Sequence, residues 1–235
     1  MIHIEEKKKC CGCTACASIC PRHCIEMKPD EEGFQYPVVD VERCVECGIC
    51  ENVCPMAKTE PEVPFPQKAY LLQHKDESVR LDSSAGGAFT AIASYVIERG
   101  GVVFGAAYDK NFQVEHTYVE RIEELWKFRN SKYVQSNMGE CFRLARDFLK
   151  NSRWVCFSGT PCQIEGLKWF LGKPHEKLVL VDVVCHGIPS PLIWNKYLEY
   201  QEISKIHPDN IRFRDKYYGY KYSTMSLVKN GETIY

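Results

Sequence analysis

The chain has 235 residues, which is enough for one ordinary domain with a small additional module or for one large domain. Hydrophobic residues make up 45% of it and charged residues 26%, a composition that is typical of a folded globular protein and excludes a disordered one. With 30 basic and 31 acidic residues the formal net charge is −1, so the chain lacks the basic surplus of a protein that binds nucleic acid.

Cysteine departs from this ordinary composition, because ten of the 14 cysteines lie between Cys10 and Cys54. The charged start of the chain contains no apolar segment of the kind found in secretory leaders. The longest nearly apolar stretch, 86–97, is shorter than the ~20 residues that a membrane span needs. We therefore predict a cytoplasmic protein with no membrane insertion. Since the cytosol keeps thiols reduced, clustered cysteines there indicate metal binding and not disulfides.

Residues 1–57 contain a cysteine repeat and are predicted to form one small module. The cysteines of the two copies, which lie 34 positions apart, are Cys10, Cys13, Cys16 and Cys20, then Cys44, Cys47, Cys50 and Cys54. Short strands are predicted at 24–27 and 37–40, on either side of an acidic turn at 30–33. So short a segment with few large apolar residues needs a staple such as bound metal in order to fold.

Each copy has the spacing C-x-x-C-x-x-C-x-x-x-C-P, which is that of bacterial ferredoxins with two 4Fe-4S clusters. In that pattern three cysteines of one copy bind a cluster together with the last cysteine of the other copy. The spacing therefore predicts one cluster on Cys10, Cys13, Cys16 and Cys54, and another on Cys44, Cys47, Cys50 and Cys20. Gly12 and Gly48 allow the tight backbone turns that wrapping a cluster requires.

Zinc is the alternative metal, because thiolates bind it as well. Zinc sites, however, usually pair two C-x-x-C motifs and need neither a third cysteine nor a following Cys-Pro, so we favour iron–sulfur clusters. Cys11 and Cys24 lie outside the repeated spacing. We expect each of them to be a packing thiol or a neighbour of a cluster, and not a ligand.

A proline-rich stretch, 58–67, is predicted to link this module to a second domain at 68–235. In the second domain, apolar runs predict strands at 69–74, 102–107, 114–119, 153–157 and 178–184. Helical spacing predicts helices at 88–98, 122–129, 139–150, 161–171 and 192–200. This alternation indicates an α/β layer with partly parallel strand pairing, in which the continuous apolar run at 178–184 is buried on both faces.

The last residues are predicted to form a β-hairpin. Its strands are 225–228 and 233–235, and Asn230-Gly231 is a favoured pair for the turn between them. Because the sequence stops within the second strand, we expect the second domain to be partial and the native chain to continue.

Two helix starts in the second domain have the residues of anion-binding sites. The segment 83–87 precedes the predicted helix at 88–98, where backbone amides and hydroxyls meet the positive helix end. The segment 158–162 follows a strand, with Thr160 as the helix cap and Pro161 at the first helical position. Ligands of α/β sheets gather at such carboxyl ends of strands. Plain helix capping is the alternative for both, and the sequence has neither the Rossmann dinucleotide motif nor a P-loop.

Four segments of the second domain together resemble the beta-subunit family of coenzyme F420 hydrogenases and dehydrogenases. They read SSAGGAFTAIASYVIERGGVVFGAAYD from Ser83, SKYVQS from Ser131, FSGTPCQIEGLKWFLG from Phe157 and VDVVCHGIPSP from Val181. The N-terminal module is also similar to that of family members that carry a ferredoxin unit, so the resemblance spans nearly the whole chain. It implies an α+β ferredoxin-like two-cluster module followed by an α/β domain of the flavin-binding type.

The resemblance also implies FAD, which accepts an electron pair as hydride and releases single electrons to iron–sulfur clusters. By motif position, the residues that line the flavin site are Ser84, Gly86, Gly87, Lys132, Tyr133, Gln135, Ser158, Gly159, Thr160 and Gln163. In this interpretation Lys132 favours the reduced flavin anion or holds phosphate, and a solvated surface lysine is the alternative. The sequence indicates no catalytic residue.

Cys162 and Cys185 match family positions that resemble half of a further 4Fe-4S site. The cysteine pair that completes such a site is absent from this sequence, so support for a third cluster is weak and two buried thiols are at least as good an interpretation. Cys141 and Cys156 are expected to pack in the core. His186 is a conceivable proton relay, although a capping or core role is the preferred interpretation.

We therefore expect an iron–sulfur flavoprotein oxidoreductase. It would pass electrons from a hydride carrier, coenzyme F420 or a similar molecule, through FAD and two 4Fe-4S clusters to a ferredoxin-like partner protein or subunit. The alternative is a non-catalytic iron–sulfur electron-transfer subunit of a larger redox complex. Neither the hydride carrier nor the partner can be identified from the residues themselves.

Overall fold

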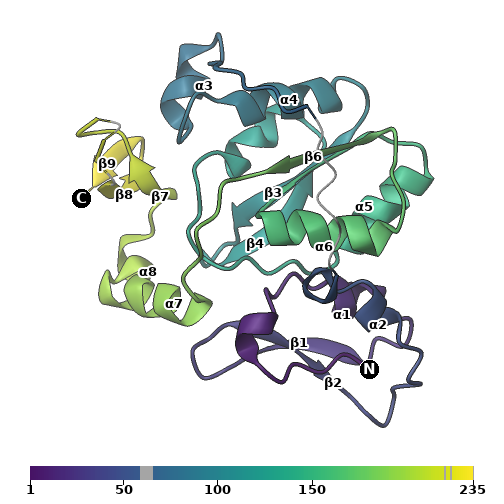
Figure 1. The fold of residues 1–235 in the computed structure, drawn as a ribbon. Coiled ribbons are helices and arrows are strands. Elements are labelled where there is room, and N and C mark those ends of the chain that lie inside the picture. Colours follow the sequence, from purple (N-terminus) through teal and green to yellow (C-terminus); the bar gives the residue numbers. More distant parts are fainter. Residues whose placement is uncertain (59–65, 220, 223, 235) are drawn as a thin grey trace.

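A small cysteine-rich unit lies against a larger α/β domain in the computed structural model (Figure 1). The structure describes residues 1–58, 66–219, 221–222 and 224–234. Most of the predicted linker, 59–65, is outside the described residues. Within the described residues no helix is both long enough and apolar enough to cross a membrane.

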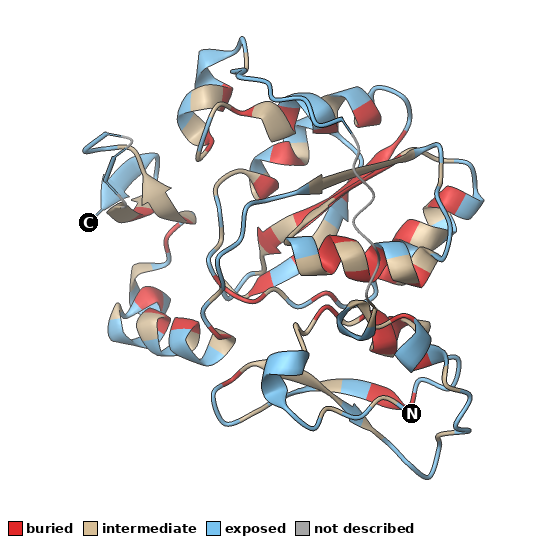
Figure 2. Ribbon diagram, viewed as in Figure 1, coloured by how far each residue is buried: buried red, intermediate tan, exposed pale blue. Residues whose placement is uncertain are grey.

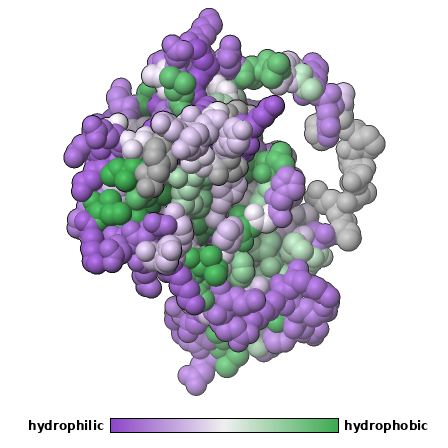
Figure 3. All heavy atoms as spheres, turned by 90° about the vertical axis from the view of Figure 1, so that its left-hand side faces the viewer, coloured by the Kyte–Doolittle hydropathy of each residue, from purple (hydrophilic) through white to green (hydrophobic). Residues whose placement is uncertain are grey.

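The cysteine-rich unit is built on one antiparallel strand pair and two short helices. Its elements are η1 (Lys7–Lys9), α1 (Ala15–Ile19), β1 (Ile25–Pro29), β2 (Gln35–Val39), α2 (Ile49–Asn52) and η2 (Pro55–Ala57). β1 pairs with β2 across the acidic turn, as the sequence predicts. Gly12 and Gly48 have φ angles of 64° and 72°, in the left-handed region that favours glycine. The face of the unit seen at the bottom of Figure 3 is mainly hydrophilic.

A four-stranded sheet forms the centre of the α/β domain. The strands β3 (Val102–Tyr108), β4 (Val114–Val119), β5 (Val155–Gly159) and β6 (Leu178–Asp182) lie in the order β4-β3-β5-β6. β3, β5 and β6 run parallel, whereas β4 is antiparallel to β3. The predicted α/β layer with partly parallel pairing is therefore confirmed. The four strands of this sheet begin within two residues of their predicted starts.

Alternate residues of the central strands point to opposite faces, so the sheet has a core on each side. Val102 and Phe104 pack against α5 (Cys141–Lys150) and α6 (Pro161–Leu171). Val103, on the other face, packs against α4 (Ala88–Ile97) and η3 (Ile122–Phe128). Figure 2 shows buried residues concentrated along the central strands and the helix faces turned toward them.

The remaining elements lie before and after this layer. They are α3 (Glu77–Asp82), α7 (Pro191–Tyr200), α8 (Ile203–Ile206), β7 (Asn210–Asp215), β8 (Thr224–Lys229) and β9 (Glu232–Ile234). β8 and β9 form the predicted hairpin, and β7 adds a third antiparallel strand that the sequence did not reveal. Trp194 of α7 and Ile211 of β7 are buried in a separate small core.

Three sequence-based predictions about the second domain were wrong. Residues 69–74 form no strand, because they have no sheet neighbour and leave Leu71 fully exposed. The run at 178–184 is not buried on both faces: β6 is an edge strand of partly exposed residues, and Val184 is 90% exposed. The helix predicted at 122–129 is a 3₁₀-helix and not an α-helix.

The cysteine-rich unit shares its core with the α/β domain. Cys13, Ala15 and Val53 belong to the same buried cluster as the inner faces of α5 and α6. The guanidinium of Arg143 in α5 donates to the carbonyls of Ala17 and Ser18 at 3.1 and 2.8 Å, and so satisfies acceptors at the end of α1. A Cβ on Gly166 of α6 would lie only 2.9 Å from the Cys13 Sγ. The two parts therefore pack as closely as elements of one domain.

We predict that Gly166→Ala destabilises this interface. In an exposed helix the same change stabilises by about 1 kcal/mol, because alanine has the higher helix propensity. Here the added methyl group overpacks against Cys13, which typically costs about 1–3 kcal/mol. Urea denaturation should show a lower free energy of unfolding, whereas the exposed control Lys168→Ala in the same helix should change it little. A more stable Gly166→Ala protein would contradict the packing described here.

Candidate metal centres and the adjoining polar site

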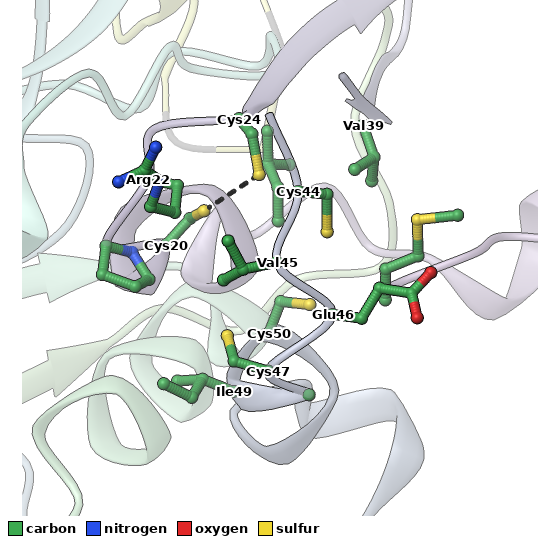
Figure 4. Close-up of a pocket in the computed structure, with 14 residues that line it drawn as sticks. Cys20, Arg22, Cys24, Val39, Cys44, Val45, Glu46, Cys47, Ile49 and Cys50 are labelled. Atoms are coloured by element: carbon green, nitrogen blue, oxygen red, sulfur yellow. Dashed lines mark hydrogen bonds between the residues drawn. The ribbon is translucent and has the colours of Figure 1, made fainter. Parts of the chain in front are cut away.

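Eight cysteines surround two separate hollows in the cysteine-rich unit. The first hollow is lined by Cys10, Cys13, Cys16 and Cys54. The second is lined by Cys20, Cys44, Cys47 and Cys50, which lie around it in Figure 4. The structure thus brings together the two crossed sets that the spacing predicts.

The crossing follows from the proline after the fourth cysteine of each copy. A residue before proline is restricted to extended conformations. Cys20 accordingly has φ −62° and ψ 115° at the end of α1, and Cys54 has φ −74° and ψ 115° after α2. Each extended residue ends the preceding turn and carries its thiol away from its own loop. The thiol therefore reaches the hollow of the other copy.

The thiols around the two hollows can be tested for the kind of metal group that they fit. In the part of the chain that the structure describes, no three His, Cys, Asp or Glu side chains are placed to hold a single metal ion. Backbone amides donate toward sulfur from Gly12 to Cys10 at 3.4 Å and from Ile2 to Cys50 at 3.2 Å. Burial raises the pKa of the Cys16 thiol to about 12, so this thiol ionises only when a bound cation compensates. The donor set and the hollows fit a metal–sulfur cluster.

The two cysteines outside the spacing are neighbours of the hollows, as predicted. The Cys24 Sγ lies 3.4 Å from the Cys20 Sγ. Cys11 lines the first hollow, and its thiol interacts with the thiol of Cys162 in α6. Cys11 is therefore also part of the boundary between the cysteine-rich unit and the α/β domain.

Gln135 joins the first hollow to the α/β domain. This residue is buried, and its backbone amide donates to the Pro189 carbonyl at 3.1 Å. Its side-chain Oε1 accepts from the backbone amide of Gln35 at 2.9 Å, across the boundary. A Cβ on Gly12, in the first cysteine loop, would lie 2.5 Å from the Gln135 Nε2. The resemblance implied a flavin-lining role for Gln135, but its side chain contacts the cysteine-rich unit.

A directional chain of hydrogen bonds lies at the carboxyl end of β5. The Ser158 carbonyl can only accept, so the His116 Nε2, 3.0 Å away, carries the proton. The His116 Nδ1 is then the acceptor for the Ser136 hydroxyl at 2.9 Å, and that hydroxyl accepts from the Gln163 Nε2 at 3.0 Å. The Gln163 Oε1 accepts from the Thr160 amide at 2.9 Å. Three of the residues predicted to line the flavin site, Ser158, Thr160 and Gln163, therefore belong to one hydrogen-bond network.

His116 was missed by the sequence analysis. It occupies an inward position of β4, where the sequence V-E-H-T-Y-V alternates between the two faces. A histidine at a core-facing position of a strand was the available signal. Burial lowers its pKa from 6.5 to about 4, so the ring is neutral at physiological pH.

The other predicted flavin residues form a second group beside α4. Ser84, Gly86 and Gly87 precede this helix, and the Ser84 hydroxyl accepts from the Ser131 amide at 2.9 Å. This contact brings the loop before α4 next to Lys132 and Tyr133. The structure therefore divides the ten residues into this group and the β5 group, with Gln135 at the boundary with the cysteine-rich unit.

Cationic side chains surround the loop before α4. Arg129 and Arg212 both bind the Asp82 carboxylate, at 3.1 and 3.0 Å. The Lys216 ammonium donates to the carbonyls of Arg80 and Ala85 at 2.9 and 3.3 Å. The Nε atoms of both arginines are buried and make no hydrogen bond within the described residues. Arg212 also pairs with the Asp215 carboxylate at 3.6 Å, so the three cations face two carboxylates, and the two Nε atoms are the donor capacity that remains.

Lys132 is neither solvated nor free. Its ammonium donates to the carbonyls of Lys127, Arg129 and Asn130 at 2.9, 3.0 and 3.2 Å. Burial lowers the pKa of Lys132 to about 7, although three carbonyl acceptors favour the charged form. All three donors of the ammonium are used in holding the loop at 127–132, which makes the alternative of a solvated surface lysine wrong.

The remaining candidates have mixed outcomes. Cys141 and Cys156 are buried in the core, as predicted. Cys162 is half-buried and interacts with Cys11, whereas Cys185 is exposed, so the interpretation of two buried thiols was wrong for Cys185. His186 is also exposed, which excludes the preferred core role.

Comparisons with known proteins divide the chain in the same way. Residues 9–58 match the family model of a 4Fe-4S dicluster domain. Residues 69–143 match the N-terminal model, and residues 152–232 the C-terminal model, of the coenzyme F420 hydrogenase/dehydrogenase beta subunit. No curated protein matches the chain.

One solved structure with a similar chain is the xenon-derivatized F420-reducing NiFe hydrogenase complex from Methanosarcina barkeri. The two chains are 16% identical with a TM-score of 0.49. The similarity covers 68% of this chain and 57% of the other, so this chain spans little more than half the length of that relative.

We predict that His116 makes the stability of the protein depend on pH. The unfolded chain takes up a proton at His116 near pH 6.5, but the folded protein does so only near pH 4. The unfolded state therefore holds more protons between these values, and the free energy of unfolding falls by roughly 3 kcal/mol as the pH drops through them. Denaturation of His116→Gln at pH 4 and pH 7 should show a smaller difference than the wild type shows. The exposed control His186→Gln should behave as wild type, and an unchanged dependence in His116→Gln would exclude this role.

Proposed function

The chain belongs to the coenzyme F420 hydrogenase/dehydrogenase beta-subunit family and carries a 4Fe-4S dicluster domain, and we propose that it is an iron–sulfur flavoprotein oxidoreductase. It passes electrons between a hydride carrier, such as coenzyme F420, and a ferredoxin-like partner. The observation that carries the proposal is the pair of four-thiol hollows, one of which packs directly on the α/β domain.

Two 4Fe-4S clusters occupy the hollows in this proposal. The ligands of the first cluster are Cys10, Cys13, Cys16 and Cys54, and those of the second are Cys20, Cys44, Cys47 and Cys50. The crossed arrangement of the thiols supports this assignment over two zinc sites, since a zinc ion needs only four converging ligands and no hollow. A third cluster has little support, because Cys162 interacts with Cys11 and not with a cysteine pair.

The cationic site beside α4 fits the phosphates of FAD. Arg129, Arg212 and Lys216 supply positive charge, and the two buried Nε atoms supply donors that lack partners in the described residues. Ser84, Gly86 and Gly87 present the amino end of a ten-residue helix, and Lys132 and Tyr133 adjoin them. Ser158, Gly159, Thr160 and Gln163 form the second part of the site at the end of β5. When bound, FAD supplies the conversion of hydride into single electrons.

The position of the hollows sets the order of electron transfer in this proposal. The first hollow adjoins the α/β domain through Cys13, Gly12 and Cys11. Both hollows are lined by residues of the cysteine-rich unit, but the contacts with Gln135, Gly166 and Cys162 of the α/β domain are made by residues that line the first hollow. A cluster in the first hollow would therefore lie between the flavin site and a cluster in the second hollow, and the second cluster would pass electrons to the partner.

A non-catalytic electron-transfer subunit is the second candidate. This candidate is favoured because two of the predicted flavin-binding side chains already have partners within the protein. The Lys132 ammonium donates to three backbone carbonyls, and the side-chain oxygen of Gln135 accepts from the Gln35 amide of the cysteine-rich unit. Iron, sulfide and flavin measured per chain after anaerobic reconstitution distinguish the two candidates. Iron and sulfide without flavin would favour the non-catalytic electron-transfer subunit, and zinc in place of iron would overturn both candidates.

We predict that Arg129→Gln with Arg212→Gln weakens FAD binding about tenfold or more, because two charge-assisted hydrogen bonds to phosphate are lost. Flavin retained per chain is the measurement, and cluster absorbance in the same sample verifies that the protein is folded. Arg99→Gln is the matched control, since Arg99 is exposed and its guanidinium donates to the Tyr95 carbonyl at 2.9 Å, away from the cationic site. Full retention of FAD by the double variant would place the flavin elsewhere.

The crossed ligation makes a separate prediction. Cys20→Ala should damage the cluster bound by Cys44, Cys47 and Cys50, although Cys20 belongs to the other copy of the repeat. Electron paramagnetic resonance of the reduced protein should lose the signal of the second cluster and retain that of the first. The control Cys24→Ala, which removes a neighbouring thiol, should keep both signals. Loss confined to the first cluster in Cys20→Ala would contradict the assignment.

A further inference from the structure

The second hollow opens on an apolar surface that the α/β domain does not cover. Three residues that line it are large and exposed: Val45 is 59% exposed, Met1 42% and Ile49 39%. The thiol-bearing residue Cys47 is exposed as well, whereas the thiols of the first hollow are buried or half-buried. In Figure 4, Val45 and Ile49 lie beside the thiols that surround the hollow. Contiguous apolar residues at a surface mark an interaction site.

Acidic side chains flank this apolar surface. The exposed loop and short helix at 40–52 contain four carboxylates, Asp40, Glu42, Glu46 and Glu51, and one cation, Arg43. Glu51 pairs with the amino terminus at 3.2 Å. Within the described ranges, no ion pair involves Glu42 or Glu46, and in Figure 4 the Glu46 carboxylate points away from the thiols. Arg22, which also lines the hollow, is an exposed cation on the opposite side from Glu46, so the negative charge lies on the side of the rim formed by residues 40–52.

We propose that this face is the docking surface for a one-electron redox protein with a basic rim around an apolar centre. The proposal rests on the proposed function, because it assumes a cluster in the second hollow. Apolar contact at Met1, Val45 and Ile49 brings the partner's redox centre close to the cluster. Glu42 and Glu46 attract a basic partner and steer its approach.

A second copy of this chain is a poor occupant for the same surface. Residues 1–57 contain 6 basic and 10 acidic residues, a net charge of −4. Two copies that met through this face would place like charges opposite each other, which disfavours association. A small diffusible acceptor does not need an apolar patch with an acidic rim. A basic protein partner uses both features.

The test follows electron transfer from the reduced, reconstituted protein to a basic c-type cytochrome by stopped-flow absorbance. With the wild type, the rate should fall about tenfold when the salt concentration rises from about 20 to about 300 mM, because salt screens the steering field. Glu42→Gln with Glu46→Gln should slow the reaction at low salt by about threefold or more. The control pair Glu98→Gln with Glu176→Gln, exposed on the α/β domain, should leave the rate unchanged.

An uncharged quinone serves as the reference acceptor, and it should oxidise all variants at equal rates. Equal effects of the two variant pairs, or a rate independent of salt, would overturn the docking proposal while the quinone reaction still reports an intact cluster. Analytical ultracentrifugation that shows a salt-dependent dimer, lost in Val45→Asp, would also overturn the proposal, because this face would then be a dimer interface. Absence of iron and sulfide from the protein would instead overturn the proposed function.

Discussion

A single backbone restriction, the proline after the fourth cysteine of each repeat, determines how the cysteine-rich unit is organised. It holds Cys20 and Cys54 in extended conformations and directs each thiol into the hollow of the other repeat. Neither hollow can then be completed by one repeat alone. The two halves of a segment with little apolar core are therefore tied to each other by their metal sites, and these sites stabilise the unit.

The unit is completed on its other side by the α/β domain. Cys13 packs against Gly166, Arg143 satisfies carbonyls of α1, and Gln135 accepts the Gln35 amide. These contacts combine close packing with hydrogen bonds, and they come from α5, α6 and the loop before α5. A flexible tether would not need such contacts. The interface fixes the first hollow relative to the end of β5, where the His116 network lies.

Much of this arrangement was predictable because it is local in sequence. The cysteine spacing specifies both thiol sets, and apolar runs place β3, β4 and β5 within two residues at their start. The failures concern information that no local pattern contains. Leu178–Asp182 reads as a buried strand, but only the strand order shows that it lies at the sheet edge. Lys132, Gln135 and His116 have partners that are distant in sequence or belong to the backbone, so their roles depended on the tertiary structure.

The unequal exposure of the two hollows has a thermodynamic consequence. Each electron added to a cluster adds negative charge, which burial disfavours, and reduction potential depends on solvent exposure for this reason. Each hollow has two buried cysteines, but Cys47 of the second hollow is exposed to solvent, whereas no cysteine of the first hollow is. Two chemically identical clusters in these hollows would differ in potential, the inner one being harder to reduce. In the proposed function, this difference in exposure would favour electron flow from the inner cluster to the outer one, without any difference in ligands.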